Sequence, residues 1–455
     1  MLNKNIQPKF NEDLLNLYSD TRSGLSTAVF GVTVSAATYL TSMLDGRVLV
    51  LCKDAVTAKN YAEELNSYTG EKSVYLPPKD DVLLYKKYFN KDSLYARISA
   101  IYQIISGARF VTATPESLMQ PFPKNIEAVK ISVASECPQD TLIKKMVEFG
   151  YKRVEFAENK GEFALRGDIF EIFPVNSEDA YRCDFFGDEI ENIRVLDTVN
   201  HVGGEEARTF FILPAIDFKI EKSEVNGLID RLSSSFKKLK TLRQTAKARQ
   251  ITGELKDLLE NENFSDSSLS YLYPLLSSTT YDFLSFLGDV TIVYIEPKMI
   301  ADTVGGITRE HTERVLGLSE AGEALDFTAK QLMSPEDFYA LLKLKKGVAF
   351  QNITTVTSFF KPNKTIRLKL TPVSKYASKP EDLYADVSNW QKSGYRSIIA
   401  VGNAERADRL KDSLYSNGIL SVITNTPEDT PGVYLVPVFI NTGFILHDEK
   451  LVVIG

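Results

Sequence analysis

The sequence has 455 residues, of which 44% are hydrophobic and 25% charged, a composition typical of folded chains and long enough for roughly three or four domains. The formal net charge is −7 and the isoelectric point is near 5.4, so any contact with DNA or anionic lipid would need a local basic patch. No apolar run approaches the roughly 18 residues that cross a bilayer, so we expect a cytoplasmic protein with no membrane contact.

Residues 1–120 alternate strand-like and helix-like segments. The apolar run RVLVLCK, at 47–53, is suited to a buried parallel strand, and Asp54 can cap the helix that follows it. Thr114 and Pro115 mark the start of another helix. This alternation predicts a parallel sheet with helices on its faces.

The stretch FGVTVSAATYL, at 30–40, has the frame of a phosphate-binding loop, G-x-x-x-x-G-K-[ST], without its working residues. Gly31 and Thr38 fit the frame, but Ala36 stands where the second glycine belongs and Ala37 where the lysine belongs. Losing such a charged contact typically costs about 2–5 kcal/mol, so we expect no useful ATP binding and no cofactor here. Spacing alone favours a simple strand-to-helix turn, since short motif frames recur by chance.

Residues 121–208 change to short alternating strands, which predict an antiparallel β-rich module. EFALRGDIFEIFP, at 162–174, is followed by YRCDFFGDEIENIRVLD, at 181–197, whose Gly187 and Asp188 form a turn between two strands. Because neighbouring side chains of a strand face opposite ways, one of Phe185 and Phe186 should point inward and the other outward.

Residues 209–352 return to the α/β pattern and add a long basic helical segment, whereas 353–455 read as a small α/β domain. Charge on a long helix usually marks a solvated face, and DNA contact is the alternative. In the small domain, only Gly402 follows the strand RSIIAVG, which gives no reason to expect a dinucleotide. The basic positions of the helical segment are Lys237, Lys238, Lys240, Arg243, Lys247 and Arg249.

The sequence has few cysteines and histidines that could form a metal site, a disulfide or a catalytic cluster. The three cysteines lie far apart and only three histidines exist, so the sequence predicts no zinc site, no disulfide framework and no catalytic residue. The last residues, LVVIG, form an apolar strand-like run without a polar tail, so we expect a piece of a longer chain.

The string GEFALRGDIFEIFPVNSEDAYRCDFFGDEIENIRVLD resembles the hairpin-rich domain shared by UvrB and the bacterial transcription-repair coupling factor (Mfd) family. The segments before and after it, 76–104 and 208–218, resemble those that flank this domain in both families. UvrB-like proteins keep the glycine and lysine of the phosphate loop, whereas the coupling factors carry a decayed copy, so Ala36 and Ala37 favour the latter. The matching positions are Gly161, Phe163, Arg166, Gly167, Phe173, Pro174, Arg182, Asp184, Phe185, Phe186, Glu189 and Ile190.

This resemblance implies a multidomain α/β fold: a degenerate helicase-like (RecA/P-loop type) parallel-sheet domain, an inserted antiparallel β-rich domain, a helical subdomain and a C-terminal small α/β domain. It also implies a non-catalytic module that recruits UvrA to stalled RNA polymerase in transcription-coupled nucleotide excision repair. ATP with Mg²⁺, RNA polymerase and double-stranded DNA would be bound by later translocase and polymerase-binding domains. We further expect a later domain to mask the UvrA-binding surface.

The partner-binding residues that the resemblance implies are Arg166, Arg182 and Phe186. Arginine on a strand can present a bidentate fork to a carboxylate, and an exposed phenylalanine can fill a pocket beside it. Carried over from the family motif, Phe186 is the outward member of its pair. Arg166 has an alternative role as a hairpin-stabilising partner of Glu171 or Asp184.

An alternative function is a divergent UvrB-like protein that remodels DNA, or binds damaged DNA, with ATP. The discriminating feature is Ala37, since without the lysine the first module lacks the charge that holds terminal phosphates.

Overall fold

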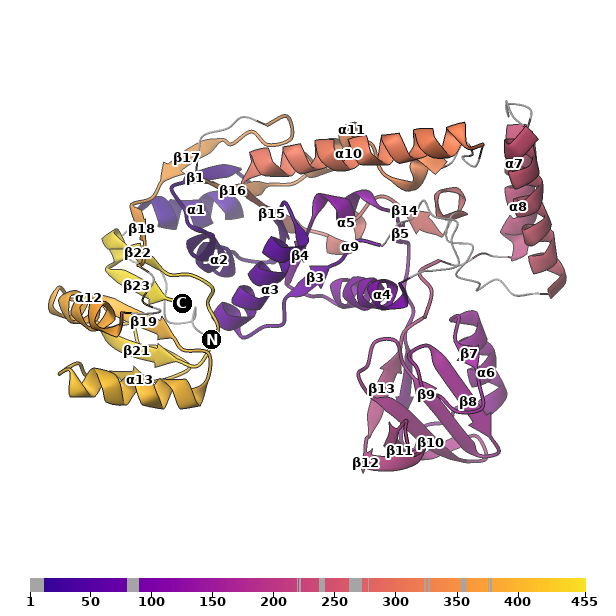
Figure 1. The fold of residues 1–455 in the computed structure, drawn as a ribbon, viewed down its shortest axis with the longest axis horizontal. Helices are drawn as coiled ribbons and strands as arrows, with labels where there is room; N and C mark the ends of the chain where they lie inside the picture. Colours follow the sequence, from indigo (N-terminus) through magenta and orange to yellow (C-terminus); the bar gives the residue numbers. More distant parts are fainter. Residues whose placement is uncertain are drawn as a thin grey trace.

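The computed structural model describes residues 12–455 except 80–89, 219, 221, 237–241, 262–271, 277, 323–324, 326–327, 353–356, 375 and 377–378. Figure 1 shows a mixed α/β molecule with a parallel sheet, further sheets and helices, as the sequence predicts for the broad fold class.

The central sheet has seven strands in the order β17-β1-β16-β15-β2-β4-β3, and every neighbouring pair is parallel. Its inner strands are apolar and buried, as expected for a sheet with helices on both faces. The predicted caps are present, because Asp54 accepts from the Thr57 N–H and Thr114 from the Ser117 N–H. The strands are β1 (Thr27–Phe30), β2 (Arg47–Leu51), β3 (Val74–Leu76), β4 (Phe110–Ala113), β15 (Val290–Ile295), β16 (Gly347–Gln351) and β17 (Lys364–Arg367).

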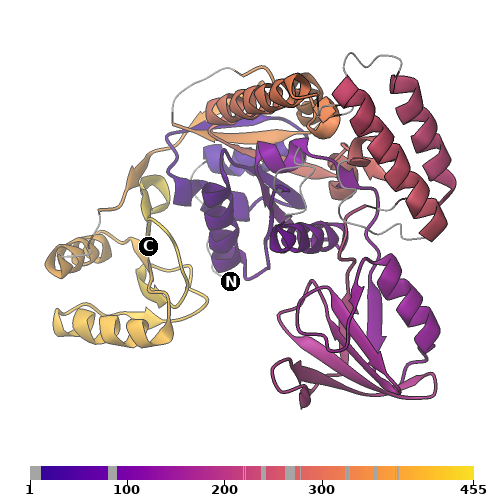
Figure 2. The same cartoon turned by 45° about the vertical axis from the view of Figure 1, so that its right-hand side comes forward.

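Helices cover both faces of the central sheet (Figures 1 and 2). They are α1 (Glu12–Arg22), α2 (Val34–Ser42), α3 (Ala55–Thr69), α4 (Lys91–Ile105), α5 (Pro115–Met119), α9 (Leu284–Leu287), α10 (Pro297–Glu320) and α11 (Pro335–Leu342), with a 3₁₀ turn at Thr328–Gln331.

A β-rich lobe, β6 to β13 with α6, stands apart from the central sheet in both views (Figure 2). Its six-stranded sheet runs β12-β11-β10-β9-β8-β7 and is antiparallel except for the β7–β8 pair, while β6 and β13 pair separately. Its elements are β6 (Val129–Ser132), α6 (Gln139–Glu148), β7 (Lys152–Arg153), β8 (Glu162–Arg166), β9 (Ile169–Phe173), β10 (Ala180–Phe186), β11 (Glu189–Asp197), β12 (Val202–Glu206) and β13 (Thr209–Ile212).

The basic helical segment is two helices, so the expectation of one long element is wrong. α7 (Lys222–Phe236) and α8 (Leu242–Asn261) pack against each other and bury a common core that includes Val225, Leu228 and Ile251. Two apolar stripes can be buried by folding one helix onto the other, which a single extended helix does not allow. Near this pair, β5 (Phe122–Pro123) joins β14 (Thr279–Thr280) in a short antiparallel ladder.

The C-terminal lobe contains a second six-stranded sheet, β18-β22-β23-β19-β21-β20, flanked by α12 and α13. Its Ile398, Val436 and Phe444 belong to the same buried cluster as Val29 and Leu40 of the central domain, so the two share one core. The elements are β18 (Leu370–Pro372), α12 (Pro380–Lys392), β19 (Arg396–Ala400), α13 (Ala404–Ser416), β20 (Val422–Ile423), β21 (Gly432–Val436), β22 (Phe444–Leu446) and β23 (Leu451–Ile454), with a 3₁₀ turn at His447–Glu449.

Candidate functional site

The three partner-binding candidates lie on one face of the six-stranded sheet of the β-rich lobe, here called the outer face. Arg182 stands opposite Glu171 of β9 in the antiparallel register, and Arg166 is on the same side of β8. The alternate positions point inward, so Phe185 is 5% exposed whereas Phe186 is 80% exposed. The predicted inward and outward orientations of this pair are confirmed.

Arg166 is held by three contacts within the lobe. Its Nη2 lies 2.6 Å from Oε1 of Glu171, its Nη1 donates to the Glu155 carbonyl, and its guanidinium lies 4.3 Å from the centroid of the Phe156 ring. Glu171 is fully buried, so it orients the arginine from below. The alternative ion pair with Glu171 is therefore present, yet a third of the Arg166 side chain, 33%, stays exposed to a partner.

Arg182 and Arg194 stand directly opposite each other on β10 and β11. Arg182 contacts Asp184 at 3.3 Å, but within the described part of the chain Arg194 forms no ion pair. Arg194 also stands opposite Glu206 of β12, so acidic side chains flank the two arginines within the lobe. Sequence reasoning missed Arg194, although the period of two along ENIRVLD places it on the same face as Asn192 and Arg182.

Phe186 ends β10 beside a turn. A register shift between Asp184 and Phe185 precedes it, and Gly187 follows with φ of +64°, a conformation that glycine adopts without strain. A large, exposed aromatic ring on the same face as two arginines has the composition of a protein-binding hot spot.

The residues that fit the phosphate-loop frame form the turn before α2 and the first turn of that helix. Gly31 has φ of +74° and Thr33 caps the helix, with Ala36 and Ala37 both buried. The helix begins after a tight turn, as in a phosphate loop, but its first turn presents methyl groups at the two altered positions.

A carboxylate fills the polar side of this turn. Glu64 of α3 is 1% exposed and accepts hydrogen bonds from the hydroxyls of Ser35, at 2.7 Å, and Thr38, at 2.8 Å. The C-terminal lobe closes the site, because the Asn441 N–H donates to Glu64 at 2.8 Å and the Thr442 N–H donates to the Ser35 hydroxyl at 3.2 Å. Burial raises the pKa of Glu64 above its ordinary value, and these hydrogen bonds oppose the rise.

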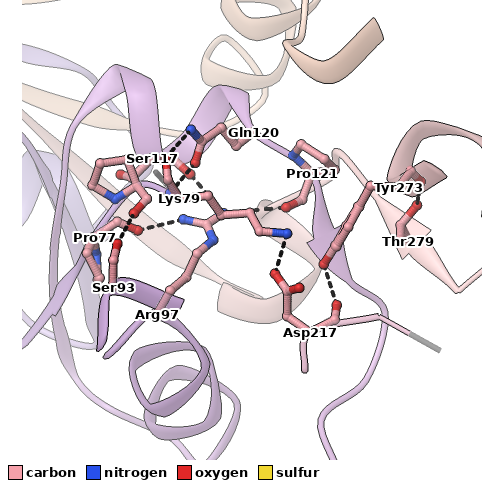
Figure 3. A network of polar contacts seen from close by, with 11 residues as sticks. Pro77, Lys79, Ser93, Arg97, Ser117, Gln120, Pro121, Asp217, Tyr273 and Thr279 are labelled. Carbon is pink, nitrogen blue, oxygen red and sulfur yellow. Dashed lines mark hydrogen bonds and ion pairs between the residues drawn. The ribbon is translucent and has the colours of Figure 1, made fainter. Parts of the chain in front are cut away.

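A buried ionic cluster lies where the β-rich lobe joins the central domain (Figure 3). The Nζ of Lys79 is 2.7 Å from Asp217 and 3.8 Å from the centroid of the Tyr273 ring, and both charged side chains are at most 2% exposed. Arg97 donates to the Pro77 carbonyl at 2.7 Å and to the Ser117 carbonyl at 3.1 Å. Burial lowers the pKa of both Lys79 and Arg97. The cluster ties the segment that follows β13, and returns from the lobe, to the loop after β3.

Half of the basic helical positions can be placed. Lys237, Lys238 and Lys240 lie outside the described residues, whereas Arg243, Lys247 and Arg249 lie on α8, at the end of the molecule that Figure 1 shows farthest from the C-terminal lobe. DNA contact there stays a hypothesis.

The described ranges contain neither a metal-binding cluster nor a membrane-spanning helix. In that part of the chain, no three His, Cys, Asp or Glu side chains are grouped to hold a metal ion. None of the described helices combines the length and apolar character needed to span a bilayer.

Comparisons with known proteins relate the β-rich lobe to a known domain family. Residues 129–218 match the family model of the UvrB interaction domain. The chain is 24% identical to a transcription-repair-coupling factor of Bacillus subtilis over 478 aligned residues, covering 98% of the chain and 39% of that protein. A transcription-repair-coupling factor of Staphylococcus aureus is 22% identical over 445 residues, with 95% and 37% covered. The chain thus spans about two fifths of the length of these relatives, and the resemblance expected from the sequence is confirmed.

Proposed function

We propose that this chain, which carries a UvrB interaction domain and resembles transcription-repair-coupling factors over nearly its whole length, recruits UvrA to stalled RNA polymerase in nucleotide excision repair. The observation that carries the proposal is the outer face of the β-rich lobe. There Arg166, Arg182 and the exposed Phe186 share one face of the sheet, within residues that match the family model.

The physical basis is a combination of preorganised charge and one apolar anchor. Glu171 fixes Arg166 before a partner arrives, so less side-chain freedom is lost on binding than for an unrestrained arginine. The Phe186 ring has to enter a pocket of the partner to be covered, and the arginines elsewhere on the same face select acidic groups of the partner.

The test is calorimetric titration of the chain with purified UvrA. We expect saturable binding that the Arg166→Ala/Arg182→Ala variant loses, with Phe186→Ala costing about 2 kcal/mol or more. Matched controls are Arg406→Ala/Arg409→Ala on α13 and Phe439→Ala, which is 55% exposed in the C-terminal lobe; these should bind as the unaltered chain does. Wild-type affinity in the arginine double variant would remove the site assignment, and no binding by the unaltered chain would remove the recruitment function.

The proposal treats the central domain, of helicase-like RecA/P-loop type, as a scaffold without catalysis. Its support is the start of α2, where Ala37 replaces the lysine and the Ser35 and Thr38 hydroxyls bond Glu64. ATP with Mg²⁺ should therefore leave the melting temperature of the chain unchanged. ATP-dependent stabilisation would favour the divergent DNA-remodelling alternative.

The remaining functions are proposed for the whole protein. The ATP-driven DNA translocase and the contact with RNA polymerase belong to domains outside this sequence. In the resting protein, a later domain masks the outer face. The protein acts in the cytoplasm. Equal affinity of UvrA for the resting intact protein and for this chain would contradict masking. Within the chain, the proposed units are 1–120, 121–208, 209–352 and 353–455.

A further inference from the structure

A basic cavity opens at the amino-terminal edge of the central sheet, the edge opposite the one where α2 begins. It has a volume of about 400 Å³. Ser26 directly precedes β1, and Lys345 stands two residues before β16, so both mark this edge. Its lining consists of Ser26, Tyr294, Lys343, Lys345, Ser358, Phe359, Phe360 and Lys361.

The charge of this cavity is of one sign. Three of its lining residues are lysines and none is acidic. Lys343 and Lys361 are exposed and form no ion pair within the described part of the chain, and Lys345 donates to the Gly288 carbonyl at 2.7 Å. Lys346 and Lys364 extend the cluster along the same edge, Lys364 being partly neutralised by Asp20 at 3.2 Å. On a chain with a net charge of −7, this is the local basic patch that contact with a polyanion needs.

The floor of the cavity is aromatic and carries a hydroxyl donor. Tyr294 is 1% exposed, and its ring centroid lies 5.4 Å from that of Phe359 and 5.1 Å from that of Phe360. The Tyr294 hydroxyl can donate a hydrogen bond into the cavity that this residue lines. Burial raises the pKa of Tyr294, so the hydroxyl stays protonated and can donate.

The spacing of the lysines along this edge suits a chain of phosphates. Lys343 and Lys345 precede β16, and Lys361 precedes β17. These two strands flank β1, so the backbones of the two lysine groups are about 10 Å apart across two strand spacings. A DNA strand places a phosphate about every 3.4 Å along the helix axis, so the two groups reach different phosphates of one backbone. Because all three lysines line one cavity, a small anion held between them is the competing ligand.

The aromatic rings distinguish double-stranded from single-stranded nucleic acid. Single strands are bound by stacking bases on exposed rings. Here Phe359 and Phe360 are only 3% and 7% exposed and are packed on Tyr294, so no ring is free to stack on a base. What the site offers is charge and hydroxyl donors, which suits a backbone whose bases are paired.

We propose that this lysine cavity, with Lys343, Lys345 and Lys361 as its charged residues, binds the phosphate backbone of double-stranded DNA without reading its sequence. The contact lies on a different lobe from the outer face and does not rest on recruitment of UvrA. It would hold duplex DNA against the central domain.

The experiment measures fluorescence anisotropy of short labelled duplexes across a salt series, with the unaltered chain and a Lys343→Gln/Lys361→Gln variant. We expect two duplexes of unrelated sequence to bind alike at low salt. The double variant should bind at least about 10-fold more weakly, and its plot of log K against log salt should be shallower by about 2, since each phosphate contact contributes about 0.9 to the slope.

The matched control is Lys392→Gln/Lys411→Gln, which removes the same charge from exposed positions of the C-terminal lobe and should keep the wild-type slope. Unaltered duplex binding in the cavity variant, or no binding by the wild-type chain at low salt, would overturn the proposal. Displacement of the duplex by inorganic phosphate, beyond the effect of an equal ionic strength of chloride, would also overturn it in favour of a small-anion site. If the cavity variant keeps the wild-type melting temperature and UvrA affinity, its loss of DNA binding is independent of folding and of the proposed recruitment of UvrA.

Discussion

Glu64 and Asn441 are 377 residues apart in the sequence, and the Asn441 backbone N–H donates a hydrogen bond of 2.8 Å to the Glu64 carboxylate. The same carboxylate holds the hydroxyls of Ser35 and Thr38 at the start of α2. One buried side chain therefore joins the altered phosphate-loop turn to the C-terminal lobe, on the polar side of a shared apolar core.

Replacing Glu64 separates the role of its charge from that of its shape. Glu64→Ala should lower the free energy of unfolding by about 1–3 kcal/mol, because the Asn441 N–H then lacks an acceptor in a buried place. Glu64→Gln should be nearly neutral, since its amide oxygen can accept from Asn441 and the hydroxyls can turn to accept from its NH₂. Urea denaturation of the two variants checks this, and equal losses in both would mean that the negative charge itself is required.

The same carboxylate should make stability depend on pH. Burial raises the pKa of Glu64 above the ordinary value of 4.5, so between that value and the raised one the folded state binds more protons than the unfolded state. This contribution to stability is fully present below pH 4.5 and is lost as the pH rises through the raised pKa. The stability of Glu64→Gln relative to the unaltered chain should therefore increase over that window and then level off. A difference that stays constant across it would show that Glu64 has no raised pKa.

Arg194 should contribute to UvrA binding although sequence reasoning missed it. It faces Arg182 across β10 and β11, so removing it relieves repulsion in the free chain while removing charge from the outer face. We expect Arg194→Ala to weaken UvrA binding by about 1–2 kcal/mol without destabilising the lobe. Calorimetric titration measures the affinity, and a melting curve the stability. Unchanged binding would mean that Arg194 is turned away from the partner, and tighter binding would mean that its charge opposes the complex.

In the ionic cluster at the base of the β-rich lobe, replacing both Lys79 and Asp217 should destabilise the fold less than replacing Asp217 alone. Asp217→Ala leaves the Lys79 ammonium buried without its counter-charge, which typically costs about 3–5 kcal/mol. Lys79→Met/Asp217→Leu removes both charges and should recover most of that loss. Urea unfolding of the single and double variants measures the coupling, and additive losses would contradict it.

Local features of the structure were predictable where short-range physics decides them. The buried strand at 47–51, the caps Asp54 and Thr114, and the opposed directions of Phe185 and Phe186 all follow from composition, capping and alternation. The division of the basic segment into α7 and α8 was not predicted, because both halves have helical periodicity and only their mutual packing separates them.

The polar clusters needed the tertiary structure. Nothing near Glu64 in the sequence points to Asn441, nor anything near Lys79 to Asp217, because each pair is brought together by chain segments that meet only in the fold. The lysine cavity is similar: Lys343, Lys345 and Lys361 follow no motif, and their common location depends on β16 and β17 both flanking β1.

The strand order of the central sheet also constrains how the chain folds as it is synthesised. β1 lies between β16 and β17, and β2 lies between β15 and β4, so β1 finds its neighbours only after residue 347 has been made. The β-rich lobe is complete far earlier, and domains generally fold as units as they emerge from the ribosome. The β-rich lobe is therefore expected to fold before the central domain, while β1 is still without the strands that it pairs with. Long-range parallel pairing of this kind is slow, so the central sheet should set the pace of folding.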